Sequence, residues 1–260
     1  MKDVVSIILA AGQGRRMQQG QKSRQKVLVK LQKKPMLGHV LEVVSAAGIQ
    51  QVIVVVGHQS EQVEKYLEGW RKRLDIRTVK QEKLLGTADA VRQTEKLLKD
   101  HKGDLLILYG DTPLLTEGTL KTLIAAHRAQ KNYCTLLTTL LKDPTGYGRI
   151  VRNGRSEAVE KIVEEVDATS EEKTVREINV GVYCFDARSL FAALREVKPN
   201  NRKNEYYLTD TIAILSRKKQ VVRSMLSDDR REALGVNSPT DLVRARQVLE
   251  GEREGGEGIQ

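Results

Sequence analysis

Aromatic residues are scarce in this sequence, where Phe, Trp and Tyr together make up 4% of the 260 residues. A packed interior must therefore be built mainly from Val, Leu, Ile and Ala. Hydrophobic residues nevertheless account for 40% of the chain and charged residues for 30%, a balance typical of globular domains. The length suits one large domain or two small ones.

Long apolar runs are missing as well. No segment approaches the roughly 20 apolar residues that a membrane-spanning helix needs, so we expect no membrane partner. The apolar stretch within MKDVVSIILAAG is short and leads into a glycine turn, which favours a first β-strand over a signal peptide. Cysteine is nearly absent, and Cys134 and Cys184 both lie in apolar runs. Two buried thiols fit a reducing cytoplasm, where we expect the protein, although a disulfide between them stays open.

Acidic residues are absent from Gln13 to Lys34, a stretch that carries eight of the cations behind the net charge of +10. These cations are Arg15, Arg16, Lys22, Arg24, Lys26, Lys30, Lys33 and Lys34. A cluster of one sign attracts polyanions, either a nucleic acid or a phosphate-rich small molecule. A solvated basic loop is the alternative for many of the individual residues.

The segment LAAGQGRRM at residues 9–17 follows the apolar run VVSII and contains two glycines one residue apart. Met17 stands where a dinucleotide-binding turn has its third glycine, and the Gly-Lys-Ser/Thr ending of a P-loop is absent. A looser anion cradle fits better, because a glycine-rich turn exposes backbone N–H groups and an arginine fork pairs with phosphate oxygens. A plain turn with solvated arginines explains these residues equally well when they are taken alone.

Apolar strand-like runs alternate with helical patterns along the first half of the chain. Strands are predicted at 4–9, 51–57, 76–79, 104–111 and 133–141, and helices at 35–48, 60–68, 87–99 and 116–130, with Ser60, Thr87 and Thr116 as N-caps. Strands that are apolar at consecutive positions are buried on both faces. The pattern therefore predicts a doubly wound α/β core of the Rossmann type with a mixed sheet.

The pattern changes after residue 142. The range 143–227 predicts a small β-rich region on the acceptor side, with helices returning at 187–197 and 205–218 and a strand at 220–226. A capped helix at 238–250 follows. We therefore expect a single domain at 1–250, in which 1–142 and 228–250 form the nucleotide-binding core. The tail at 251–260, GEREGGEGIQ, is rich in Gly and Glu and is predicted to be disordered.

Candidate functional residues fall at the carboxyl ends of the predicted strands, where open α/β sheets bind ligands. The glycine turn follows the first strand, and Asp111 ends the run LLILYGD. The segment LGTADA at 85–90 opens a helix, whose first backbone N–H groups are expected to be free for a ligand. An acid at a strand end beside a cationic loop suits Mg²⁺, although Asp-Thr-Pro is equally typical of a turn.

Seven motifs then occur in one order and spacing, namely LAAGQGRRM, LGTADA, LYGDTPLL, DPTGYGRI, EINVGVY, NEYYLTD and GVNSPTDL. Together they resemble the sugar-1-phosphate nucleotidyltransferases, and within them the uridyltransferase domain of the bifunctional N-acetylglucosamine-1-phosphate uridyltransferases. The resemblance covers about residues 4 to 249. In that family the domain is normally followed by a left-handed β-helix that carries an acetyltransferase. These 260 residues contain no hexapeptide repeat, so we expect no acetyl transfer from this chain.

The resemblance implies a reaction and a set of site residues. It implies Mg²⁺-dependent transfer of a uridylyl group from UTP to N-acetylglucosamine-1-phosphate, with Arg16 and Lys26 as catalytic cations. Nucleotide binding is implied for Leu9, Ala11, Gly12, Gly14, Arg16, Lys26, Gln81, Gly86 and Thr87. Sugar-phosphate binding is implied for Gly148, Glu164 and Asn179, and metal binding for Asp111 and Asn237. Tyr147 and Thr209 are neighbouring residues whose first expected role is packing.

The sequence departs from the family pattern at several positions. Arg15 stands where the family has Thr, Gln25 where it has Pro, and Leu84 where it has Gln. On the acceptor side, Val166 and Val180 replace polar residues. These departures leave open another sugar-1-phosphate, such as glucose-1-phosphate, or another nucleotide, such as dTTP. A nucleic-acid-binding module that uses 13–34 is a remote alternative, and a silent regulatory subunit is disfavoured because the phosphate and metal residues are kept.

Overall fold

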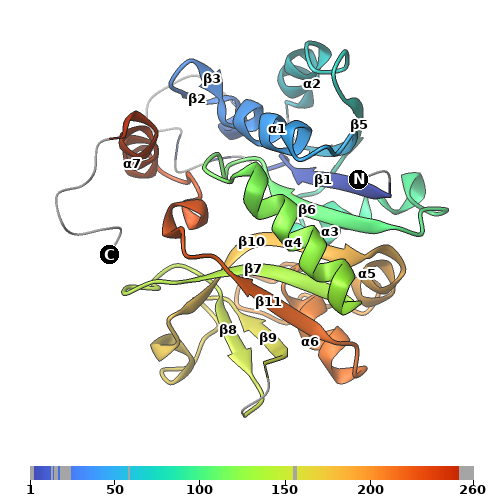
Figure 1. The fold of residues 1–260 in the computed structure, drawn as a ribbon, viewed down its shortest axis with the longest axis vertical. Helices are drawn as coiled ribbons and strands as arrows, with labels where there is room; N and C mark the ends of the chain where they lie inside the picture. The colour runs from blue at the N-terminus through green and yellow to red at the C-terminus, as the bar shows by residue number, and fades with distance from the viewer. Residues whose placement is uncertain are drawn as a thin grey trace.

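The computed structural model describes residues 3–12, 14, 17, 25–57, 59–154 and 157–251 (Figure 1). The predicted tail therefore lies outside the described residues, except for Gly251. The strands of the described part are β1 (Val4–Leu9), β2 (Lys30–Leu31), β3 (Lys34–Pro35), β4 (Gln51–Val56), β5 (Asp75–Lys80), β6 (Asp104–Tyr109), β7 (Cys134–Leu140), β8 (Arg149–Arg152), β9 (Val159–Val163), β10 (Glu177–Asp186) and β11 (Val222–Leu226). The α-helices are α1 (Met36–Ala46), α2 (Ser60–Glu68), α3 (Thr87–Arg92), α4 (Glu117–Gln130), α5 (Ala187–Leu194), α6 (Asp210–Arg217) and α7 (Pro239–Glu250).

The central sheet has the strand order β11-β7-β10-β6-β1-β4-β5. Strand β1 pairs in parallel with both β4 and β6, and β4 pairs in parallel with β5. Strand β10 runs antiparallel to its neighbours β6 and β7, whereas β11 is parallel to β7. The sheet is therefore mixed, as predicted. The hairpin of β8 and β9 joins it through β10 and lies at one end of the molecule (Figure 1).

Both faces of the sheet are covered, which explains why its inner strands are apolar at consecutive positions. In β1, Val4 and Ile8 pack with α1, α2 and α4 on one face, whereas Val5, Ile7 and Leu9 pack with α3, α5 and α6 on the other. Successive side chains of a strand point to opposite faces, so a strand between two helical layers buries all of them. This is the doubly wound arrangement that the sequence predicted.

The predicted helix starts are partly right. Thr116 caps α4 by accepting from Thr119 N at 3.2 Å, and Ser238 caps α7 in a capping box with Asp241. The caps predicted at Ser60 and Thr87 are wrong, because each is already the first helical residue, preceded by Gln59 and Gly86. The helix predicted at 205–218 is also too long, since α6 begins at Asp210.

The second half of the chain contributes to the central sheet as well as to its edge. Strands β10 and β11 come from the range 143–227 and lie within the sheet, while β8 and β9 extend it. Helix α7 packs against the β2–β3 hairpin through a small apolar cluster that includes Leu31, Met36 and Ala245. Cys134 and Cys184 are both buried and form no disulfide. Among the described residues, no helix combines the length and the apolarity required to cross a bilayer.

Candidate active site

A cavity of about 490 Å³ opens at the carboxyl ends of β1 and β6. Every predicted nucleotide-binding residue that the structure describes lines it, together with both predicted metal ligands. The lining residues are Leu9, Ala11, Gly12, Gly14, Lys26, Val27, Gln81, Leu84, Gly86, Thr87, Ala90, Tyr109, Asp111, Glu205 and Asn237. Arg16 lies outside the described residues. The structure therefore brings together residues that lie more than 200 positions apart in the sequence.

Three polar side chains converge within this cavity. The Lys26 ammonium forms an ion pair with the Asp111 carboxylate and donates to Asn237 Oδ1 at 2.7 Å. Lys26 is 8% exposed, and a buried ammonium is retained only where anionic or polar groups compensate it. The Asn237 amide is oriented for this contact, because its Nδ2 donates to Gly235 O at 3.3 Å. One carboxylate oxygen and one amide oxygen thus face a single cationic group.

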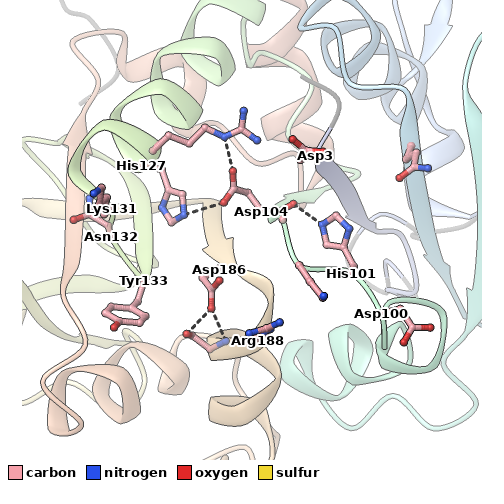
Figure 2. Close-up of a pocket in the computed structure, with 15 residues that line it drawn as sticks. Asp3, Asp100, His101, Asp104, His127, Lys131, Asn132, Tyr133, Asp186 and Arg188 are labelled. Carbon is pink, nitrogen blue, oxygen red and sulfur yellow. Dashed lines mark hydrogen bonds and ion pairs between the residues drawn. The ribbon is translucent and has the colours of Figure 1, made fainter.

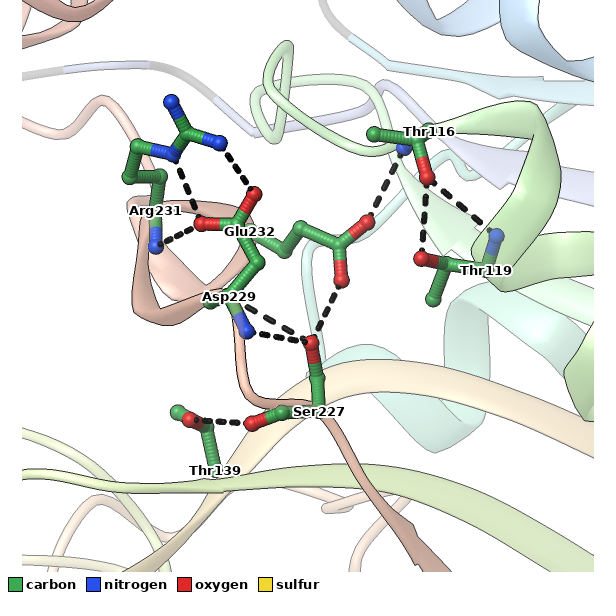
Figure 3. A network of polar contacts seen from close by, with 7 residues as sticks. All are labelled: Thr116, Thr119, Thr139, Ser227, Asp229, Arg231 and Glu232. Carbon is green, nitrogen blue, oxygen red and sulfur yellow. Dashed lines mark hydrogen bonds and ion pairs between the residues drawn. The ribbon is translucent and has the colours of Figure 1, made fainter.

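A polar network ties together the segments that carry Asp111 and Asn237 (Figure 3). The carboxylate of Glu232, which is 1% exposed, accepts from Thr116 N at 3.1 Å and from Ser227 Oγ at 2.8 Å. The backbone completes the connection, since Val236 N donates to Asp111 O at 2.9 Å. The loop after β6 and the segment before α7 are therefore held side by side, which fixes the separation of the two oxygen donors.

The segment 85–88 is shaped by its contact with the chain around Tyr206. Tyr206 N donates to Leu85 O at 2.7 Å, and Ala88 N donates to Tyr206 O at 2.9 Å. The N–H of Ala88, which the sequence predicted to be free for a ligand, is therefore engaged. Gly86 has a φ of +119°, and a Cβ at this position would collide with the backbone of Tyr206. Only glycine fits here, on both conformational and steric grounds.

The predicted sugar-phosphate residues form a second group. Asn179 N donates to Gly148 O at 2.9 Å, and a Cβ on Gly148 would lie 3.6 Å from Glu164 Oε1 and 2.9 Å from Ile162 Cγ2. Asn179 Nδ2 donates to the Tyr183 hydroxyl at 2.6 Å. The three residues are thus neighbours, and the close approach at Gly148 depends on its missing side chain.

Glu164 has an unusual electrostatic environment. Desolvation raises its pKa, and this effect outweighs the hydrogen bond that Thr209 Oγ1 donates to Glu164 Oε1 at 3.1 Å. Glu164 in turn affects Asp210. The pKa of Asp210 is raised to about 6 by burial and by the charges of Glu164 and Asp167. Thr209, expected to serve packing, is therefore a polar partner of the predicted acceptor residue Glu164.

Tyr109 connects the two groups. It lines the cavity at the end of β6, and its ring lies 3.0 Å from the position that a Cβ on Gly181 would take. Desolvation raises the pKa of its hydroxyl, with a further contribution from the Glu164 charge. Sequence reasoning missed Tyr109 because an aromatic residue ending a buried strand is typical of packing. The feature of the sequence that could have indicated a role in the site is its position directly before Gly110 and Asp111.

A larger hollow of about 950 Å³ lies at the opposite ends of the parallel strands (Figure 2). Its main polar groups are engaged with one another. Asp104 accepts from Arg128 Nε at 2.6 Å and lies 3.5 Å from His127 Nε2, and Asp186 caps α5 by accepting from Ser189 N at 2.8 Å. Burial works against ionisation of Asp104, but the hydrogen bonds from His127 and Arg128 leave its pKa below the usual value. These contacts serve the fold, and none of the predicted site residues lines this hollow.

Comparison with known proteins identifies the family of this chain. Residues 5–233 match the family described as "Nucleotidyl transferase". The chain belongs to the nucleotidyl transferase family. This confirms the predicted resemblance and the predicted enzyme class, a sugar-1-phosphate nucleotidyltransferase.

Curated relatives include two proteins named "Bifunctional protein GlmU". The one from Acetivibrio thermocellus is 42% identical, with 96% of this chain and 52% of the relative covered, and the one from Halalkalibacterium halodurans is 45% identical, with 96% and 53% covered. The chain therefore spans about half the length of these relatives.

Solved structures share the fold at low sequence identity. A UDP-glucose pyrophosphorylase complexed with UDP-glucose superposes with a TM-score of 0.78 at 18% identity, covering 96% of this chain and 99% of that one. A putative glucose-1-phosphate thymidylyltransferase from Bacillus anthracis also gives 0.78, at 21% identity, with 98% and 97% covered. At these identities the likeness confirms the Rossmann-like fold class alone.

Proposed function

We propose that this nucleotidyltransferase moves the uridylyl group of UTP onto N-acetylglucosamine-1-phosphate, giving UDP-N-acetylglucosamine and pyrophosphate. The observation that supports this most is the cavity that gathers Lys26, Asp111 and Asn237 with the glycine turn and with Gln81, Gly86 and Thr87. The similarity to the GlmU proteins supports the choice of nucleotide and sugar. Glucose-1-phosphate and dTTP are the nearest alternatives.

The donor set at this site suits Mg²⁺. Asp111 offers a carboxylate oxygen and Asn237 an amide oxygen. Both oxygens contact the Lys26 ammonium, so they converge on one position. Mg²⁺ prefers oxygen ligands and is commonly bound by one or two protein groups together with substrate phosphates and water. Among the described residues there is no group of three or more His, Cys, Asp or Glu side chains that could hold a metal, so the proposed site has few protein ligands. When bound, the ion neutralises charge on the triphosphate.

The chemistry needs little from the protein beyond charge and alignment. An oxygen of the sugar-1-phosphate attacks the α-phosphorus of UTP, a P–O bond forms there, and the bond to the departing pyrophosphate breaks. The nucleophile carries nearly two negative charges at pH 7, because its second pKa is about 6. No general base is therefore required. Lys26 and Arg16 reduce the repulsion between the two anions and align them.

The acceptor is proposed to lie against Gly148, Glu164 and Asn179. Their backbone and side-chain oxygen and nitrogen atoms can accept hydrogen bonds from, and donate them to, the hydroxyl groups and the amide of a sugar. Tyr109 lines the cavity and its ring lies beside Gly181, two residues after Asn179, which supports binding of the two substrates on adjoining surfaces.

A screen of pyrophosphate release tests the assignment. Five nucleoside triphosphates are combined with a panel of sugar-1-phosphates in the presence of Mg²⁺. UTP with N-acetylglucosamine-1-phosphate should give the highest kcat/KM. A higher value for glucose-1-phosphate or for dTTP would replace the proposed substrate, and salt-sensitive binding of RNA or DNA without any turnover would replace the proposed function.

A further inference from the structure

Gln81 is a buried amide at the wall of the cavity. It follows β5, is 4% exposed and lines the cavity together with Gly86 and Thr87. Its Nε2 donates twice, to the backbone oxygen of Gly86 at 3.0 Å and to Oδ2 of Asp89 at 2.8 Å. Gly86 and Asp89 both belong to the segment that opens α3, so the Gln81 amide is held by the same cavity wall that it lines.

The chemistry of these partners fixes which end of the amide faces the ligand. A carboxylate and a backbone carbonyl can only accept hydrogen bonds, so each must meet the NH₂ end of Gln81. With both N–H groups engaged, the amide has only its oxygen left for a ligand. Exchange of oxygen and nitrogen would set the single amide oxygen against the carboxylate oxygen of Asp89 and the carbonyl oxygen of Gly86, which is unfavourable in a buried position.

We propose that Asp89 is a positioning residue that locks the Gln81 amide with its oxygen toward the nucleotide base. This inference rests on the proposed function, in which the cavity holds UTP. An acceptor held against ring position 3 of the base requires an N–H at that position. Uracil carries N3–H, whereas cytosine presents a bare nitrogen at the same ring position. The carboxylate of Asp89 therefore selects uracil over cytosine without touching the base.

The test is Asp89→Asn, which keeps the size of the side chain but allows it to donate as well as to accept. Gln81 can then turn its NH₂ toward the base, opposed only by the Gly86 carbonyl. We expect the ratio of kcat/KM for UTP to that for CTP to fall about tenfold, equivalent to about 1.4 kcal/mol, because one hydrogen bond to the base is mismatched. Binding of UTP and CTP without the sugar phosphate, measured by calorimetry, should show the same fall in the ratio of Kd values.

Glu95→Gln is the matched control. It removes the same charge from an exposed acid that pairs with Arg195 on the surface, and it should leave the UTP-to-CTP ratio unchanged. Asp89→Ser provides a second variant if Asp89→Asn unfolds at a lower temperature than the wild type, because a hydroxyl also donates and accepts.

Failure of the role of Asp89 and failure of the proposed function give different results. An unchanged ratio in both Asp89 variants, or equal losses for UTP and CTP, would overturn the role of Asp89 while leaving uridylyl transfer in place. Failure of the wild-type protein to bind UTP in calorimetry would overturn the proposed function, and the inference with it.

Discussion

The proposed nucleotide side and the proposed acceptor side of the site are built differently. Backbone shapes the nucleotide side, where the glycine turn and the contact between Gly86 and Tyr206 set the cavity wall. Side chains shape the acceptor side, where Glu164 accepts from Thr209 and Asn179 donates to Tyr183. A backbone-lined wall is suited to phosphates and a flat base, whereas a side-chain wall distinguishes one sugar from another.

The two sides also differ in how they treat charge. On the nucleotide side, the buried cation Lys26 has a carboxylate and an amide oxygen as partners. On the acceptor side, burial raises the pKa of Glu164 and lifts that of Asp210 to about 6. On the proposed nucleotide side the buried charge is therefore compensated by an ion pair, whereas on the proposed acceptor side burial raises the pKa of the acids. Changes at Lys26 and Asp111 should affect the rate, and changes on the second side should affect the selectivity for the sugar or the stability.

The largest effect is expected from Asp111→Asn. A neutral amide is a much poorer Mg²⁺ ligand than a carboxylate, and it also leaves the Lys26 ammonium without its counter-ion. We expect kcat/KM to fall on the order of 100-fold or more, with the protein still folded at the assay temperature but with a lower thermal unfolding midpoint, because the buried ammonium loses its partner. Turnover within tenfold of the wild type would show that Asp111 is not central to the reaction.

A smaller but still large effect is expected from Lys26→Ala, with Lys34→Ala as its control. Lys26 is buried against Asp111, whereas Lys34 pairs with Glu42 in an exposed position. Exposed ion pairs contribute about 0–1 kcal/mol, so the Lys34 variant should keep its kcat/KM within about threefold. Arg16→Ala should behave like Lys26→Ala. Equal losses in all three variants would identify 13–34 as a diffuse polyanion surface instead.

On the acceptor side, Asn179→Ala should alter selectivity more than rate. Removing this amide leaves the Tyr183 hydroxyl and Gly181 N without their partner, and it removes one proposed contact to the sugar. We expect the preference for N-acetylglucosamine-1-phosphate over glucose-1-phosphate to shrink about tenfold, with the KM for UTP nearly unchanged. An increase in KM for UTP as large as that for the sugar phosphate would show that the two sides are not separate.

The smallest effect concerns stability. Because the folded-state pKa of Asp210 is about 6, above the usual 3.8, the stability linked to its protonated form is present below pH 4 and is lost as the pH rises through 6. Asp210→Asn removes this dependence. We expect a gain at pH 7.5 of about 1 kcal/mol after solvent screening, or roughly 2–4 °C in the unfolding midpoint. The gain should vanish at pH 4, and an equal gain at both values would point to another cause.

The sequence predicted most of the fold and the location of the site for physical reasons. Consecutive apolar positions in β1 and β6 indicate strands that are buried on both faces. Asp111 follows the end of a strand, where sheets of this type bind ligands. Local signals were less informative about hydrogen bonding. Ser60 and Thr87 are suitable capping residues, yet Thr87 Oγ1 accepts from Leu208 N at 2.9 Å, a partner 121 residues away that no local pattern indicates.

Long-range contacts account for the remaining gaps. The role of Thr209 depends on Glu164, and that of Glu232 on Thr116 and Ser227. Each pair becomes visible only when distant segments are brought together. Resemblance to a family supplied Gly148, Glu164 and Asn179 as a set, and the structure places them side by side. Their role toward a sugar phosphate stays a prediction.

The reversed direction of β10 has a consequence for how such a protein can diversify. Because β10 runs against β6 and β7, its first residues, including Asn179, arrive beside the last residues of β6. Gly148 and Glu164 reach the same place from the β8–β9 hairpin, outside the parallel strands β1, β4 and β5. Substitution on the proposed acceptor side, or exchange of the hairpin, would therefore change the proposed sugar-binding wall without altering the parallel strands β1, β4 and β5.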